Sequence, residues 1–178
     1  GLMVFWFVIR SMKYFFITDI GIARQLWYWY YLPMLFIPLF SLFVAISLGK
    51  PENARLSKTA LLLLSIPTVL CLLLVLTNDL HQLVFSFPEG EVWTDINNGY
   101  TFGYYIVLGW EILCALAAFV IMIIKCRLSY RKKYLPFLLL ACSIVYAFIY
   151  VSGVEWMQLI GGDIAAAQCL MFTGILES

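Results

Sequence analysis

Long runs of apolar residues, separated by short polar segments, make up most of the chain. A helix that crosses a bilayer needs about 20 mostly apolar residues, and six runs approach or reach that length. The six runs are residues 1–17, 26–48, 59–76, 104–124, 134–151 and 164 onward. The pattern therefore predicts an all-α fold, a polytopic transmembrane helical bundle with six visible spans.

The composition agrees with a membrane protein and argues against an ordinary soluble domain. Apolar and aromatic residues make up 64% of the chain and charged residues only 12%, whereas soluble domains have roughly 45–50% and about 25%. Most of these side chains are therefore expected to face membrane lipid or one another. The five cysteines lie in or beside apolar runs without CxxC spacing, which is typical of buried small hydrophobic residues.

The two ends of the chain lack the features of natural boundaries. Arg10 and Lys13 break the first apolar run, no signal-peptide pattern follows Gly1, and the last run still has a helical pattern near Ser178. We therefore expect residues 1–178 to form one transmembrane domain that is a fragment of a longer protein.

The distribution of lysine and arginine predicts the orientation, because short cytoplasmic loops retain an excess of these residues. The bias places the loop 78–103 outside the cell membrane and the end of the last helix in the cytoplasm. The aromatic run 27–31 then lies at the outer interface, where indole and phenol rings are favoured. Loops on the predicted cytoplasmic side hold Lys50, Arg55, Lys58, Lys125, Arg127, Arg131, Lys132 and Lys133, and those on the other side hold Arg10, Lys13 and Arg24.

A polar segment at the end of the third run is the first candidate sensing site. On a continued helix, Asn78 and Gln82 lie one turn apart, as do Thr77 and His81. These side chains could line a pocket that opens outward, with His81 as a ligand-binding or pH-sensing group. The alternative is structural: the polar side chains end the helix and hydrogen-bond its terminal groups.

Glu111 is the second candidate, because it lies inside the fourth apolar run. A carboxylate that faced lipid would cost several kcal/mol, so we expect the side chain to face the bundle interior. It either pairs there with a polar partner or ligand, or lies close enough to the interface to reach water.

Three basic residues lie on the side predicted to be poor in them, namely Arg10, Lys13 and Arg24. Either they pair with outer carboxylates such as Asp19, or they contact an anionic headgroup or ligand. The sequence does not choose between these alternatives.

Sequence motifs for catalysis or cofactor binding are absent. The last run has no lysine for a retinal Schiff base, the single histidine cannot form a His-based metal site or haem pair, and neither HExxH nor a phosphate loop occurs. The net charge of +1 gives no argument for nucleic acid. We expect no cofactor, no metal site, no nucleic-acid partner and no catalytic activity in these residues.

Two motifs carry a resemblance to a known family. The first motif is the run 24–33 with Pro38 after it, and the second is the segment 77–85. Their order resembles that in the seven-helix N-terminal sensor region of bacterial histidine kinases, to which residues 103–105 and Trp110 are similar too. The resemblance implies a seven-helix membrane domain whose first helix is missing here. It also implies a cytoplasmic output domain and homodimers of the full-length protein.

We therefore expect a membrane-embedded sensory input domain. A small-molecule or envelope stimulus would alter packing around Asn78, His81, Gln82 and Glu111, and the last helix would pass the change to the cytoplasm. The main alternative is a small-molecule or proton-coupled transporter, with Glu111 and His81 on the transport path. A third possibility is a purely structural membrane anchor.

Overall fold

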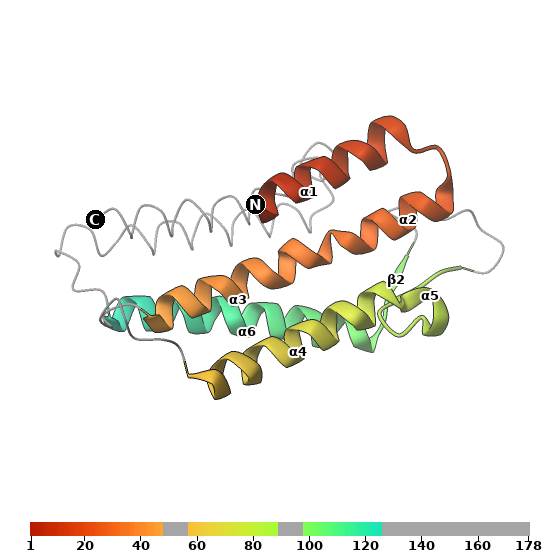
Figure 1. Ribbon diagram of the computed structural model, residues 1–178. Helices are drawn as coiled ribbons and strands as arrows, with labels where there is room; N and C mark the ends of the chain where they lie inside the picture. Colours follow the sequence, from red (N-terminus) through yellow and green to blue (C-terminus); the bar gives the residue numbers. More distant parts are fainter. Residues whose placement is uncertain (48–56, 89–97, 126–178) are drawn as a thin grey trace. The chain divides into compact units, whose positions relative to one another are not determined.

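The computed structural model describes residues 1–47, 57–88 and 98–125, most of which are helical (Figure 1). The chain divides into two compact units, Gly1–Ala118 and Phe119–Ser178, and the core and site described below lie in the first. The predicted spans 134–151 and 164 onward lie outside the described residues. The elements are α1 Leu2–Ser11, a π-helix Met12–Phe16, α2 Ile20–Trp29, α3 Tyr31–Ser47, α4 Lys58–Leu76, α5 Asn78–His81, β1 Phe85–Ser86, β2 Gly99–Tyr100 and α6 Phe102–Lys125.

Three helical segments in the described part are long and apolar enough to cross a membrane. They are Ile20–Ser47, which joins α2 and α3, Lys58–Leu76 and Phe102–Met122. These segments coincide with the predicted second, third and fourth spans, although the second begins earlier than expected. It begins at Ile20 because the Asp19 side chain accepts a hydrogen bond from the Ile22 backbone N–H at 2.9 Å and so caps α2.

The first apolar run is helical but shorter than a full span. Arg10 and Lys13 do not end the helix, which continues through them into the π-helix and stops at Phe16. The Arg10 guanidinium lies 4.9 Å from the centre of the Trp6 ring, and Lys13 Nζ lies 4.9 Å from that of Tyr14. Aromatic faces therefore accommodate both cations within an apolar helix.

A turn at Tyr30 separates α2 from α3. Pro33 has no N–H to donate to the carbonyl of Trp29, so the helical hydrogen-bond ladder is interrupted at this point. The break lies inside the aromatic run that was expected at the membrane interface.

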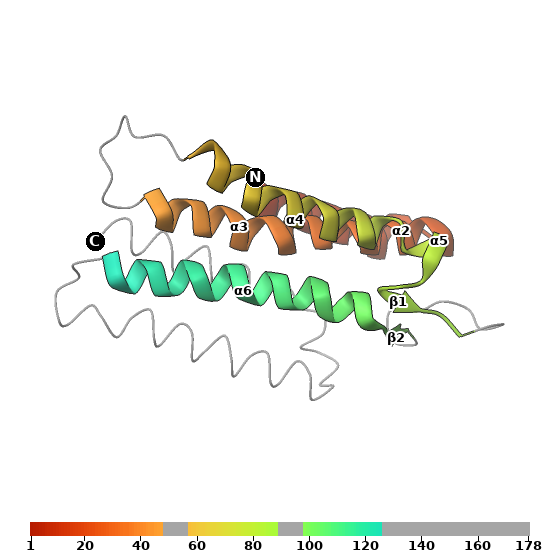
Figure 2. The same ribbon diagram turned by 90° about the horizontal axis from the view of Figure 1, so that it is seen from below.

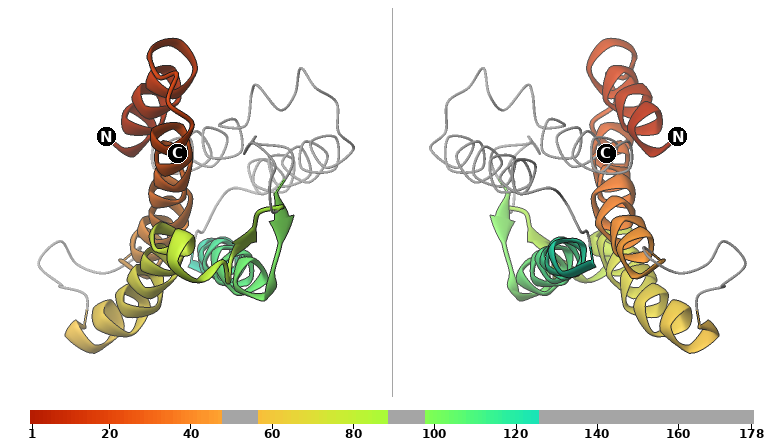
Figure 3. Two further views of the ribbon diagram at one scale, coloured as in Figure 1. Left: turned by 90° about the vertical axis from the view of Figure 1, so that its right-hand side faces the viewer. Right: turned by 90° about the vertical axis from the view of Figure 1, so that its left-hand side faces the viewer.

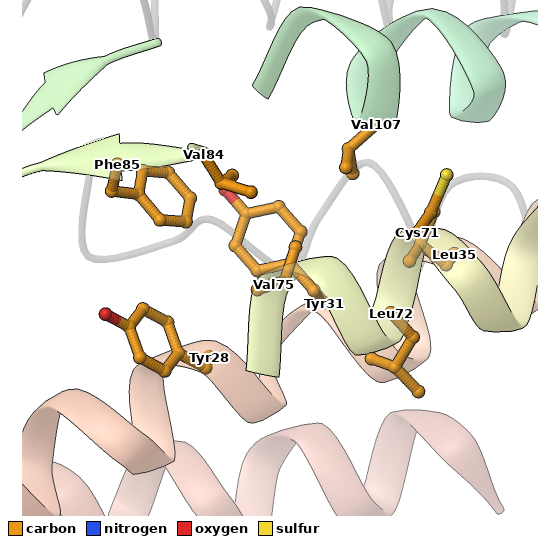
Figure 4. Close-up of a cluster of buried hydrophobic side chains, with 9 residues drawn as sticks. All are labelled: Tyr28, Tyr31, Leu35, Cys71, Leu72, Val75, Val84, Phe85 and Val107. Atoms are coloured by element: carbon orange, nitrogen blue, oxygen red, sulfur yellow. The ribbon is translucent and has the colours of Figure 1, made fainter. Parts of the chain in front are cut away.

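The main core of the unit gathers where α2, α3, α4 and α6 meet β1 (Figure 4). Figures 2 and 3 show α5, β1 and β2 at the end where α6 begins. The fully buried ring of Phe85 lies 4.5 Å from Trp27, 5.7 Å from Tyr31 and 5.9 Å from Tyr104, measured between ring centres. The core cluster contains Tyr28, Tyr31, Leu35, Cys71, Leu72, Val75, Val84, Phe85 and Val107.

Large apolar side chains remain exposed away from this core. On α4, Leu62 is 58% exposed, Leu63 64% and Leu70 59%, as expected for a helix whose outer face contacts lipid. Cys71 and Cys114 are free and buried, which confirms the predicted role of these two cysteines as small core residues. Among the described residues, β1 and β2 form an antiparallel pair of two residues each. The sequence did not predict these strands.

Candidate functional site

Five polar side chains from α2 and α5 form a connected group near the end of α4, which we name the α2–α5 cluster: Arg24, Gln25, Tyr28, Asn78 and Asp79. The local sequence positions it. Helix α4 ends at Leu76, and the hydroxyl of the following residue, Thr77, donates to the Leu73 carbonyl at 2.7 Å. The single turn of α5 follows. Gln82 then adopts the left-handed conformation, with φ of 48°, and redirects the chain toward β1.

Asn78 is fully buried and makes four hydrogen bonds. Its Oδ1 accepts from the backbone N–H groups of Val84 at 2.9 Å and Phe85 at 3.0 Å. Its Nδ2 donates to the Phe85 carbonyl at 3.0 Å and to the Tyr28 hydroxyl at 3.3 Å. These bonds use the whole hydrogen-bonding capacity of the amide, so Asn78 holds β1 against the helices and leaves no group for a ligand.

Asp79 receives several donors, all from α2. Its Oδ1 accepts from the Tyr28 hydroxyl at 2.6 Å and forms an ion pair with Arg24 Nε at 3.1 Å. Its Oδ2 accepts from Arg24 Nη2 at 3.2 Å and from Gln25 Nε2 at 2.8 Å. The side chain therefore ties α2 to α5 across more than 50 residues of sequence.

The Asp79 contacts identify the partner of Arg24. Arg24 does pair with a carboxylate, but not with Asp19, because that side chain caps α2. Asp79 was not among the site residues predicted from the sequence. The available signal was the spacing of Arg24, Gln25 and Tyr28, which places three donors on neighbouring positions of one helix.

His81 and Gln82 shape the turn that leads from α5 to β1. His81 Nε2 lies 3.1 Å from the Thr77 hydroxyl oxygen, as the spacing of one helical turn predicted, and Nδ1 accepts from the Leu83 backbone N–H at 3.0 Å. The Gln82 side-chain oxygen accepts from the Phe87 backbone N–H at 3.3 Å. Both side chains therefore satisfy local polar groups.

No polar contact among the described residues connects Glu111 to the α2–α5 cluster. Glu111 is half-buried and occupies the same face of α6 as three buried residues, Val107, Cys114 and Ala118. Within the described residues, no hydrogen bond or ion pair involves its carboxylate. Next to it, Trp110 Nε1 donates to the Thr68 hydroxyl on α4 at 2.9 Å.

The described part of the chain contains no group of three or more His, Cys, Asp or Glu side chains placed to hold a metal ion. What it does contain is a carboxylate held by a guanidinium, an amide and a phenol. This arrangement is suited to anion recognition and to linking helices.

In a comparison with protein families, the family described as the N-terminal 7TM region of histidine kinase matches residues 1–176. The match includes every described element and confirms the resemblance drawn from the sequence motifs. Comparisons with curated proteins and with solved structures found no match.

Proposed function

The chain belongs to the family of N-terminal seven-transmembrane regions of histidine kinases, and from this premise we propose that it is the membrane-embedded sensory input domain of a bacterial signal-transduction histidine kinase. An extracellular or intramembrane stimulus changes the packing of its helices, and the last helix passes this change to a cytoplasmic output domain. The family match over residues 1–176 is the observation that carries the proposal.

The contacts at the start of α6 support this function. There, α2, α4, α5 and β1 meet through the α2–α5 cluster and the aromatic contacts of Phe85. A stimulus shifts the balance between two packings only if it binds them with different free energies, and this difference is commonly about 1–3 kcal/mol. Because a single hydrogen bond contributes about 1 kcal/mol, breaking one or two bonds of the cluster is enough to change the balance.

The proposed orientation has the α2–α5 cluster outside the cell membrane and the basic loops in the cytoplasm. Membrane lipid surrounds the exposed apolar faces, and the full-length protein works as a homodimer. Labelling of single cysteines in intact cells tests the orientation, in a background in which the five native cysteines are replaced. Pro88→Cys is expected to react with an impermeant reagent, whereas Ser57→Cys is expected to react only after lysis; the reverse result contradicts the topology.

Autophosphorylation of the full-length protein in membrane vesicles tests the function itself. Arg24→Ala removes the ion pair with Asp79 and is expected to change the rate of autophosphorylation at equal protein abundance. Leu62→Ala, on the exposed face of α4, is the control and is expected to leave that rate unchanged. Solute uptake by the vesicles without any phosphorylation would instead support a transporter.

A further inference from the structure

Helix α2 presents a set of donors that fits a planar anion with two oxygens. Arg24 approaches the Asp79 carboxylate along its Nε–Nη2 edge, at 3.1 Å from Oδ1 and 3.2 Å from Oδ2. The Tyr28 hydroxyl donates to Oδ1, and Gln25 Nε2 donates to Oδ2. Oδ2 thus accepts two hydrogen bonds, and Oδ1 accepts one and forms an ion pair with Arg24 Nε, an arrangement that suits a carboxylate.

Two of the three donors, Arg24 and Tyr28, also make contacts that do not involve Asp79. The guanidinium of Arg24 lies over the Phe87 ring, with 5.1 Å from Cζ to the ring centre. Tyr28 is fully buried and stacks on Phe85 at 6.2 Å between ring centres. These aromatic contacts do not depend on the carboxylate, so they preorganise the Arg24 and Tyr28 side chains, and preorganisation favours binding.

The carboxylate comes from a short segment that water can reach. The side chains of Arg24 and Asp79 are 29% and 28% exposed, and α5 is a single turn of four residues. Neighbouring Asn78 anchors α5 through its own four hydrogen bonds, so Asp79 can leave the donors by rotating its side chain without unfolding the turn.

We propose that Arg24, Gln25 and Tyr28 form a binding site for a small carboxylate of the aqueous phase, and that Asp79 is its internal occupant. A carboxylate ligand replaces Asp79 and releases the link between α2 and α5. The inference deepens the proposed function by naming the chemical class of the stimulus. Only the effect of carboxylate binding on signalling rests on the proposed function, and the binding itself does not.

Chemical rescue of Asp79→Ala tests the site. This variant of the full-length protein, purified in detergent, leaves the three donors in place and opens space for an acetate ion. Its Tm is expected to fall below that of the wild type, and sodium acetate is expected to restore roughly half of the loss, in a saturable manner. Sodium chloride and sodium phosphate at equal ionic strength are the matched controls and are expected to restore little.

Two further variants make the test specific. Asp79→Asn fills the same space and is expected to show no acetate effect, and the double variant Asp79→Ala with Arg24→Ala is expected to lose the rescue. Equal rescue by chloride would show screening of charge only, and equal rescue by phosphate would show a general anion site; either result overturns the proposal. So does a lack of acetate rescue.

If Asp79→Ala yields no folded protein, acetate present during growth and solubilisation is expected to restore it. Failure of acetate to do so for both Asp79→Ala and Asp79→Ser overturns the proposal. The Tm assay does not depend on kinase output. Acetate rescue without any effect of acetate on autophosphorylation would support the binding site while contradicting its role in signalling.

Discussion

The indole N–H of Trp110 on α6 donates a 2.9 Å hydrogen bond to the hydroxyl of Thr68 on α4. Thr68 is fully buried, and its own hydroxyl hydrogen is donated to the Leu64 carbonyl one turn earlier, at 2.9 Å. The threonine therefore acts as acceptor and donor at once. This polar link joins two membrane-spanning segments through otherwise apolar surfaces.

Thr68→Val is expected to destabilise the protein by about 1 kcal/mol, because the valine keeps the shape but leaves the indole N–H without an acceptor. Thr59→Val, the same change at an exposed position of α4, is the control and is expected to have little effect. Unfolding in mixed micelles measures both. A double-mutant cycle with Trp110→Phe is expected to give a coupling of roughly 0.6 kcal/mol, and zero coupling would contradict the link.

Gly103→Ala is expected to destabilise the start of α6 by about 1–3 kcal/mol through overpacking. A Cβ atom at residue 103 would lie 2.5 Å from the Leu83 carbonyl oxygen, a backbone atom that already accepts the Gly103 N–H at 2.8 Å. Gly109→Ala on the same helix is the matched control, since nothing lies within 4 Å of its added Cβ. It is expected to be neutral or to stabilise by about 0.5–1 kcal/mol. Equal unfolding midpoints for the two variants would contradict this packing.

The spans were predictable because lipid leaves few choices for the backbone. A long apolar segment satisfies its backbone groups in a bilayer by forming a helix, so the runs 59–76 and 104–124 agree closely with α4 and α6. The start of α2 was missed, since Asp19 was considered as a charge rather than as a helix cap. The π-helix was also missed, because no local pattern indicates how aromatic rings accommodate Lys13.

The site was only partly predictable, because its geometry depends on contacts between distant residues. The polar segment after α4 was recognised, but sequence spacing could not show that Gln82 turns the chain back and brings Phe85 into the core. That reversal converts Asn78 from a presumed pocket residue into a buried anchor. The pairing of Asp79 with α2 likewise depends on how the helices pack.

Asn78→Leu is expected to cost about 3 kcal/mol or more, since it leaves two buried backbone N–H groups, of Val84 and Phe85, without an acceptor. Leu80→Ala, at an 86% exposed position of the same turn, is the control and is expected to cost little. Unfolding in micelles and hydrogen exchange at the two amides measure the effect. Wild-type protection of these amides in the variant would show that Asn78 does not anchor β1.

His81 is expected to adopt the Nε2–H tautomer in the folded protein. The Leu83 backbone N–H can only donate, so Nδ1 must accept, and the Thr77 hydroxyl already donates to Leu73, so Nε2 must be the donor to that oxygen. Because the chain has one histidine, ¹⁵N-histidine labelling gives a single pair of ring signals. A proton found on Nδ1 would contradict this hydrogen-bond arrangement.

Glu111→Gln is expected to change signalling without loss of stability. On the buried face of α6 a carboxylate is costly to hold, and within the described residues no partner compensates for it, so the neutral isostere should be at least as stable. Leu113→Ala, at a 58% exposed position of the same helix, is the control for autophosphorylation. A stability loss of about 3 kcal/mol or more would instead reveal a buried ion pair and make Glu111 structural. Unchanged stability with unchanged autophosphorylation would remove Glu111 from the sensing site.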